Sequence, residues 1–229
     1  MKNATISADL VSSTALSVEE LTLLQSEIRH FLDDLSLNSD GNSWGRLFKG
    51  DSVEIFLLDP RRALRVALLL KALVKKSPVS LKTNNNVRRS LFRRYGVRIA
   101  VGIGEMRVAD QKMDVLDGEA IYNSGRLLET QKKTPKDRLS IKRSLFFGSK
   151  DSALNAQMDV IFGLLDGILK ELTIRQSEIL YYKLLGANEE EIASKLSIKQ
   201  SAVNQQSNSI CWPAIVSAVN YFETLDFGS

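Results

Sequence analysis

The order of its strand and helix patterns constrains the fold of this chain more than any other feature. Alternating apolar residues indicate strands, and apolar residues at helical spacing indicate amphipathic helices. The predicted elements are a strand at 4–8, a helix after Ser17, strands at 43–50 and 52–58, a helix at 60–76, a strand at 97–108, a helix at 117–131, a strand at 138–142 and a helix at 151–170. The first eight of these, in the order β-α-β-β-α-β-α-β, predict an α+β sandwich close to the ferredoxin-like β-α-β-β-α-β arrangement.

From residue 171 onward the pattern is helical, and the composition shifts toward amides and acids. Gly186 ends one predicted helix, and Asn188 caps the next with Glu191 three positions further on. A turn then leads into a recognition helix at 199–210, which completes a helix-turn-helix pattern similar to sigma-factor region 4 and LuxR-type modules, and a last amphipathic helix follows from Trp212. The predicted division is a sheet domain at 1–148, a connecting helix at 149–170 and a helix-turn-helix domain at 171–229.

The formal net charge of +4 is unevenly distributed along the chain. Residues 171–229 hold four basic and seven acidic residues, a net charge of −3, so residues 1–170 carry +7. Residues 60–98, which we call the basic segment, contain twelve Lys and Arg and no acidic residue. Such a segment is typical either of a surface for an anionic partner, such as nucleic acid, or of a solvated helix face followed by a loop.

The composition also excludes several classes of site. One cysteine rules out a disulfide framework and a Cys-rich zinc site. With one histidine, the chain cannot provide both a histidine-based catalytic dyad and a second histidine for a metal ion. The longest apolar run, at 63–74, is interrupted by Arg65 and Lys71 and is too short to span a bilayer. No secretory signal pattern follows Met1. We therefore expect a cytoplasmic protein with no membrane partner.

Two aspartates lie at predicted strand ends. Asp9 ends the first strand, and Asp51 lies in the hairpin that a ferredoxin-like sheet places beside that strand. Two carboxylates facing one cleft suit Mg²⁺, and a pair of metal ions can activate a hydroxyl and stabilise a leaving pyrophosphate. Residues 10–14 lead into a predicted helix, whose N-terminal amides can bind phosphate. The alternative is that both aspartates only form turns.

Three segments together resemble the class III nucleotidyl cyclase catalytic domain. They are ADLVSST at 8–14, FKGDSVEIF at 48–56 and RIAVGIGE…DGEAIYNSGRLLE at 98–129. The chain is also similar to small bacterial proteins of the SatD type, which carry a comparable GDS hairpin and DGEA…SGR helix before a C-terminal helix-turn-helix. The resemblance covers roughly residues 4–142 and implies a cyclase-like fold for the sheet domain.

The resemblance also implies roles for individual residues. Asp9 and Asp51 fall on the two metal-binding positions for Mg²⁺ or Mn²⁺, and Arg126 falls on the arginine that stabilises phosphate charge in the transition state. Because the cyclase site forms between two protomers, the resemblance implies a homodimer that binds a purine nucleotide through this domain. The candidate nucleotide- and phosphate-binding residues are Ser12, Ser13, Thr14, Lys49, Ser52 and Asp117.

The chain departs from the cyclase pattern where the family orients the ribose and selects the base. Tyr122 replaces the ribose-binding asparagine, and Asn123, one residue later, is the remaining candidate for that catalytic amide. Leu47 replaces the purine-selecting lysine, while Asp114 and Asp117 are candidates for the purine-selecting acid. These departures are compatible with metal and triphosphate binding and argue against cyclisation.

The predicted recognition helix presents side chains that can read DNA. Amides bind adenine edges bidentately, and lysine contacts guanine or phosphate. The candidate DNA-binding residues are Lys199, Gln200, Ser201, Asn204, Gln205 and Asn208. Because phosphate contacts dominate DNA affinity, this net-negative domain needs charge from the basic segment or from dimerisation. The alternative is a helical domain that only packs against the sheet domain or a partner.

Three hypotheses follow from the sequence. The first is a DNA-binding transcriptional regulator whose cyclase-like domain senses a nucleotide with Mg²⁺. The second is an active class III nucleotidyl cyclase, which converts a purine nucleoside triphosphate to a cyclic nucleotide under the control of its helix-turn-helix domain. The third is a non-enzymatic protein-interaction module.

Overall fold

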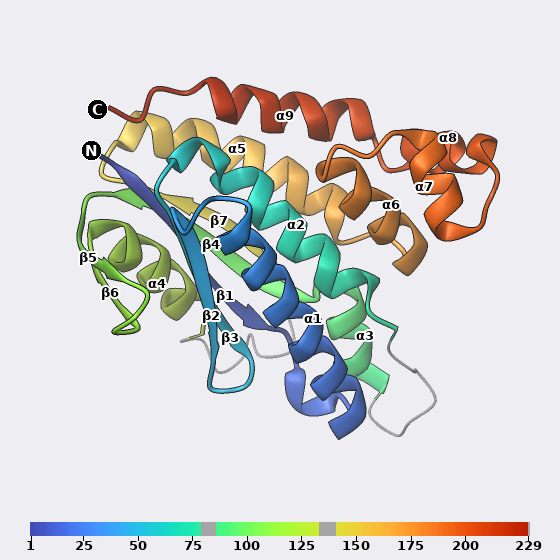
Figure 1. Ribbon diagram of the computed structural model, residues 1–229, viewed down its shortest axis with the longest axis horizontal. Coiled ribbons are helices and arrows are strands. Elements are labelled where there is room, and N and C mark those ends of the chain that lie inside the picture. The colour runs from blue at the N-terminus through green and yellow to red at the C-terminus, as the bar shows by residue number, and fades with distance from the viewer. Residues whose placement is uncertain (79–85, 133–140, 229) are drawn as a thin grey trace.

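The computed structural model describes residues 1–78, 86–132 and 141–228 (Figure 1). Their elements are β1 (Asn3–Leu10), η1 (Ser13–Ala15), α1 (Val18–Leu37), β2 (Ser43–Phe48), β3 (Ser52–Leu57), η2 (Pro60–Arg62), α2 (Ala63–Lys76), α3 (Asn86–Tyr95), β4 (Val97–Gly104), β5 (Met106–Asp110), β6 (Val115–Gly118), α4 (Glu119–Lys132), β7 (Leu145–Gly148), α5 (Ser152–Leu169), α6 (Ile174–Leu184), α7 (Glu189–Leu196), α8 (Gln200–Ser209) and α9 (Trp212–Thr224). The elements η1 and η2 are single 3₁₀ turns. The predicted mixed α+β architecture is confirmed.

The main sheet has five strands in the order β2-β3-β1-β4-β7, and β5 and β6 form a separate hairpin. Strand β1 lies antiparallel to both β3 and β4, while β7 runs parallel to β4. The helix α1 connects β1 to β2, and α2 and α3 connect β3 to β4. The first four strands therefore follow the predicted β-α-β-β-α-β connection.

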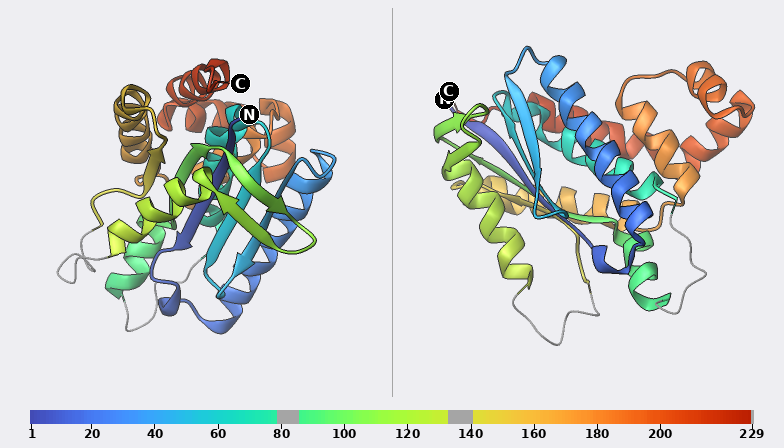
Figure 2. Two further views of the ribbon diagram at one scale, coloured as in Figure 1. Left: turned by 90° about the vertical axis from the view of Figure 1, so that its left-hand side faces the viewer. Right: turned by 60° about the horizontal axis from the view of Figure 1, so that its bottom comes forward.

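Strand β1 divides its side chains between two different environments. Its even-numbered residues, such as Ile6 and Leu10, belong to the main core, which also contains residues of α1 and α2. Its odd-numbered residues face α4, where Thr5 and Ser7 make hydrogen bonds of 3.0 and 2.7 Å with the hydroxyl of Ser124. Helices therefore cover both faces of the sheet (Figure 2), and Asp9 continues the polar row.

The helix α1 begins as predicted. The Ser17 hydroxyl accepts a hydrogen bond from the Glu20 amide, and the Glu20 carboxylate accepts one from the Ser17 amide. This capping box satisfies two backbone donors that would otherwise lack a partner at the helix start. The predicted residues Leu24, Ile28 and Phe31 are buried against the sheet.

The C-terminal helices pack on the α2 side of the sheet (Figure 1). Leu180 and Leu184 of α6 and Phe222 of α9 belong to the same buried core as α2 and the strands. A separate small core holds α6, α7 and α8 together, formed by Ile179, Ile192, Ala193 and Val203. The three-way division of the chain stays a prediction, but the packing joins its parts through one continuous core.

Three elements differ from the sequence expectations. The predicted strand at 97–108 is divided at Glu105, where β4 ends and the β5–β6 hairpin begins. The predicted strand at 138–142 lies partly outside the described residues, the rest of it has no regular structure, and the strand that pairs with β4 is β7. The sequence pattern did not predict helix α3. Its buried face includes Arg89 beside Phe92 and Tyr95, so the helix lacks a continuous apolar stripe.

Candidate functional site

The two aspartates lie at the same end of neighbouring strands, as predicted. Asp9 of β1 pairs across the sheet with Ser52 of β3, and Asp51 immediately precedes that residue. The Leu10 amide donates to the Asp51 carbonyl at 2.9 Å, which fixes the hairpin to the end of β1. The Asp51 carboxylate accepts a hydrogen bond of 3.0 Å from the Ser13 hydroxyl and a longer one, 3.4 Å, from Ser52.

The candidate phosphate-binding residues that follow β1 form a short 3₁₀ turn and not the N-terminus of α1. Ser12 has a left-handed backbone with φ 53°, and Ser13 begins the 3₁₀ turn η1. The helix α1 begins only at Val18, so the backbone amides of residues 12–14 belong to the turn before it and are not the first amides of that helix. Ser13 instead supports Asp51, and Thr14 is exposed.

Strand alternation separates the candidates on the hairpin. Leu47, at the position where the cyclases carry the purine-selecting lysine, packs against the main core and therefore faces away from Asp9. Lys49 lies in the turn with φ 50°, and its ammonium is 5.8 Å from the centre of the Phe48 ring. Arg46, which sequence reasoning missed, pairs with Glu54 of β3 and with Asp114 at the tip of the β5–β6 hairpin.

A second residue that sequence reasoning missed is Arg98 of β4. It lies directly across from Asp9 in the sheet register. Its Nε donates to Asp9 Oδ1 at 3.0 Å, and its Nη2 donates to Asp9 Oδ2 at 2.5 Å. A bidentate contact of this kind is among the strongest hydrogen-bonded ion pairs in proteins. The carboxylate that the resemblance assigns to metal binding is therefore held by a guanidinium.

The donor set fits one divalent ion better than a pair. Asp51 and the Ser13 hydroxyl supply hard oxygen atoms, and Mg²⁺ commonly uses one or two carboxylates together with substrate phosphates. Asp9 could join such an ion only against the charge of Arg98. No group of three or more His, Cys, Asp or Glu side chains gathers at one point within residues 1–78, 86–132 and 141–228.

The candidates on α4 form a second cluster. The Arg126 side chain is exposed, and its guanidinium carbon lies 5.9 Å from the centre of the Tyr122 ring. The Tyr122 hydroxyl donates to Asp117, and Arg107 pairs with the same carboxylate at 2.8 Å. The hydrogen bond from Tyr122 has the larger effect and the contact with Arg107 the smaller, and together they hold the pKa of Asp117 below its ordinary value. The Asn123 amide donates to the Ile103 carbonyl at 2.9 Å, so it anchors α4 to β4.

Arg126 and Asn123 line two open cavities, of ≈ 600 and ≈ 520 Å³. One also contains Phe147 and Asn155, and the other contains Arg107, Tyr122 and Lys150. Among the described residues, neither cavity is lined by Asp9 or Asp51. The two halves of the predicted site therefore do not share a cavity within one chain.

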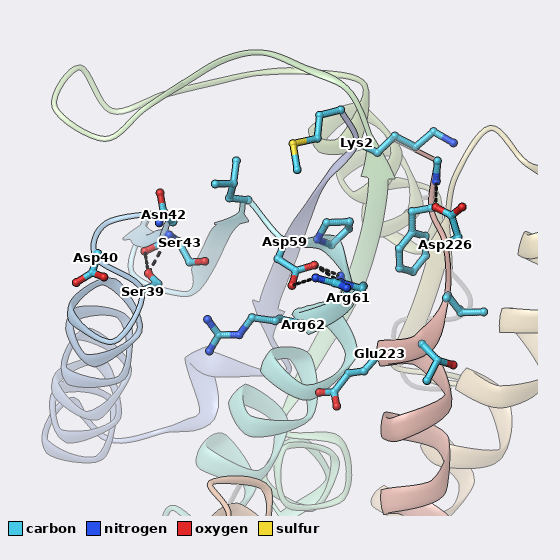
Figure 3. A pocket seen from close by; sticks show the side chains of 17 residues that line it. Lys2, Ser39, Asp40, Asn42, Ser43, Asp59, Arg61, Arg62, Glu223 and Asp226 are labelled. Carbon is cyan, nitrogen blue, oxygen red and sulfur yellow. Dashed lines mark hydrogen bonds and ion pairs between the residues drawn. The ribbon is translucent and has the colours of Figure 1, made fainter.

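A larger cavity, of ≈ 730 Å³, lies at the other end of β1 (Figure 3). Its walls come from the α1–β2 turn, from η2 and from the residues that follow α9. Arg61 is fixed there by Asp59, and Arg62 extends toward the side of Ser39 and Asp40 (Figure 3). None of the predicted site residues is among the residues described as lining this cavity.

The basic segment is largely neutralised within the fold. Its ion pairs with acids outside the segment join Arg61 to Asp59, Arg65 to Glu223, Lys71 to Asp166, Lys76 to Glu27, Arg89 to Glu20, Arg94 to Glu171 and Arg98 to Asp9. Two of these acids, Glu171 and Glu223, belong to the net-negative residues 171–229, so the oppositely charged parts of the chain contact each other. Much of the segment's charge therefore serves internal contacts.

The candidate DNA-binding residues share one surface. All of them are exposed, on α8 or directly before it, while Val203 and Ser207 on the opposite face are buried. The helix α7 begins at a capping box formed by Asn188 and Glu191, as predicted. Its first turn holds three glutamates, and the Asn204 amide lies 3.4 Å from the carboxylate of Glu189.

The described helices include none with the length and apolar character needed to cross a membrane. No protein-family model matches this chain, and no curated protein matches it.

Proposed function

We propose that this protein is a DNA-binding transcriptional regulator whose sheet domain binds a purine nucleotide with Mg²⁺ and passes that state to the helix-turn-helix domain. The observation that supports DNA binding best is the two-sided character of α8. One side is buried in the small core around Val203, and the other exposes Gln200, Asn204 and Asn208. Exposed amides on a second helix match the hydrogen-bonding edges of bases in a major groove.

Electrostatics favours binding as a homodimer. Glu189, one of three glutamates in the first turn of α7, lies beside the reading face of α8 and repels phosphate, so one helix-turn-helix domain holds DNA weakly. Two copies double the base contacts along one duplex. A dimer through the cyclase-like domain also agrees with the separation of Asp51 from the cavities of Arg126, because each shared site then takes one part from each copy.

The packing around α8 supports communication between the two domains. Before it in the chain, α6 packs on α2 and Leu184 accepts a hydrogen bond of 3.1 Å from Arg65. After it, α9 returns along the sheet domain, where Phe222 contacts Phe147 of β7 with ring centres 6.0 Å apart. A shift in the sheet domain therefore moves the elements on both sides of α8.

An active nucleotidyl cyclase is the second candidate, favoured by the placement of Asp9 and Asp51 on neighbouring strands. Incubating the protein with ATP or GTP and Mn²⁺ and separating the products by chromatography distinguishes it from a sensor. A cyclic product identifies an enzyme, and binding without turnover identifies a sensor.

Removing one amide from the reading face of α8 should weaken sequence-specific DNA binding. We expect Asn204→Ala to lower affinity for a duplex selected from a random pool by about tenfold, since one bidentate base contact is worth about 1–3 kcal/mol. Fluorescence anisotropy at fixed salt measures this. Gln157→Ala, which removes an exposed amide on α5, should bind like the wild type. Failure to select any duplex, or equal losses in both variants, would contradict the assignment.

Removing the charge of Asp51 should weaken metal-dependent nucleotide binding. We expect Asp51→Asn to lower the affinity for ATP or GTP in the presence of Mg²⁺ by about tenfold or more, because contacts to charged groups contribute about 1.5–3 kcal/mol. Isothermal titration with and without Mg²⁺ measures the difference. Asp33→Asn, an exposed site on α1, is the matched control. Equal affinities for the two variants would place the nucleotide elsewhere.

A further inference from the structure

The Arg98–Asp9 pair is built into the sheet. The two residues face each other on neighbouring antiparallel strands, so the backbone register holds their side chains together. Both carboxylate oxygens of Asp9 accept hydrogen bonds, from Nε and Nη2 of Arg98. The side chains are only 9% and 19% exposed, so water screens the pair poorly. A guanidinium also stays protonated at every physiological pH.

Asp51 has a different environment, although it lies one residue from the cross-strand partner of Asp9. Its carboxylate is supported by hydroxyl groups, those of Ser13 and Ser52. A hydroxyl donor leaves the negative charge of a carboxylate uncompensated, whereas a guanidinium cancels it. A divalent cation is therefore attracted to Asp51, and it meets a positive charge when it approaches Asp9.

We propose that Arg98 is the resident cation of this site. It neutralises Asp9 and prevents a divalent ion from using that carboxylate, so that Asp51 alone provides the charged protein ligand for a single metal ion. This inference rests on the proposed function only where it speaks of the nucleotide that accompanies the ion. Arg98 thus determines how many ions the site holds.

The pair also bears on what the site can do with a nucleotide. A pair of metal ions a few ångströms apart needs bridging carboxylates, and Asp9 cannot bridge while both of its oxygens are bound to Arg98. One ion with the nucleotide phosphates is sufficient for binding. Arg98 therefore favours a site that retains its nucleotide over one that converts it.

The test is a Mn²⁺ titration without nucleotide, followed by calorimetry or by the electron paramagnetic resonance signal of free Mn²⁺. We expect Arg98→Gln to bind Mn²⁺ about tenfold more tightly than the wild type or better, since it removes the positive charge and the hydrogen bonds that compete for Asp9. Arg98→Lys, which keeps the positive charge, should stay close to the wild type. Arg88→Gln, exposed on α3, controls for the general loss of a positive charge.

A second pair of variants tests the inference if Arg98→Gln does not fold. The double variant Asp9→Asn/Arg98→Gln removes the ion pair without leaving an unpaired charge, so it should leave Mn²⁺ affinity nearly unchanged, while Asp51→Asn should lower it. Equal losses in these two variants would overturn the proposal. So would an Arg98→Gln protein that is folded by circular dichroism and binds Mn²⁺ no better than the wild type.

Nucleotide titrations of the same proteins separate the inference from the proposed function. If Arg98→Gln gains Mn²⁺ affinity while no variant binds ATP or GTP, Arg98 is the resident cation and the sensor function fails. If the wild type binds nucleotide with Mg²⁺ but Arg98→Gln gains no affinity for Mn²⁺, the sensor function holds and the role of Arg98 is refuted.

Discussion

Replacing Lys71 with methionine is expected to lower the free energy of unfolding by about 3–5 kcal/mol, the usual cost of removing one partner from a buried ion pair. Lys71 is completely buried. Its ammonium donates to the Val97 carbonyl at 2.7 Å and to the Ser144 hydroxyl at 2.6 Å. That hydroxyl in turn donates to Asp166 at 2.5 Å. The network joins α2, β4, the residue before β7 and α5, so its loss should affect the whole fold.

Chemical denaturation of matched variants measures this effect. Lys76→Met lies on the same helix, and its ion pair with Glu27 is longer, at 3.7 Å, and partly exposed, so it should cost at most about 1 kcal/mol. The double variant Lys71→Met/Asp166→Asn should recover part of the loss, because it also removes the buried negative charge. If Lys71→Met is as mild as Lys76→Met, the network does not stabilise the fold.

The cost should also depend on pH. Burial lowers the pKa of Lys71 to about 7, against an ordinary value of 10.5. Above pH 7 the unfolded chain therefore holds a proton that the folded chain has released, and wild-type stability rises with pH by up to about 1.4 kcal/mol per unit. Burial lowers the pKa of Lys75 to about 8 with the same sign. The difference in unfolding free energy between the wild type and Lys71→Met should increase from pH 7 to pH 10 and stay constant below pH 7.

The role of Lys71 illustrates what the sequence pattern could not predict. In the sequence it is one of twelve basic residues without an acidic neighbour, and the segment was expected either to bind an anion or to face solvent. Its partner Asp166 lies 95 positions later, on a helix that was predicted as only amphipathic. Local patterns identified both helices because capping and apolar spacing are local. The contact between them depends on packing across the chain.

The candidate site shows the same division between local and long-range information. The predicted strand order placed Asp9 and Asp51 at one end of the sheet, because few arrangements of a β-α-β-β unit are possible. Alternation along β4 puts Arg98 on the face of the sheet opposite Val97 and Ile99. Its contact with Asp9 requires the register of β1 against β4, which no local pattern fixes.

Substituting Gly102 with alanine is expected to cost about 3 kcal/mol, the upper end of the usual penalty for overpacking. A Cβ atom at this position of β4 would lie 2.2 Å from the Ala120 carbonyl oxygen and 2.6 Å from the Ser124 amide nitrogen. Both atoms belong to the backbone of α4, so no side-chain rotation relieves the contact, and the helix must move away from the sheet. The hydrogen bonds that join the Ser124 hydroxyl to those of Thr5 and Ser7 would be strained as a result.

Moving α4 should also change the proposed nucleotide site, since that helix carries Arg126 and Tyr122. We expect Gly102→Ala to lower both the melting temperature and the affinity for Mg²⁺-nucleotide. Gly125→Ala is the control, because its added Cβ meets nothing within 4 Å and alanine should stabilise the helix by up to about 1 kcal/mol. If both variants melt like the wild type, α4 does not need this close approach. If Gly102→Ala is destabilised but binds nucleotide normally, the nucleotide does not depend on α4, and Arg126 has no part in binding it.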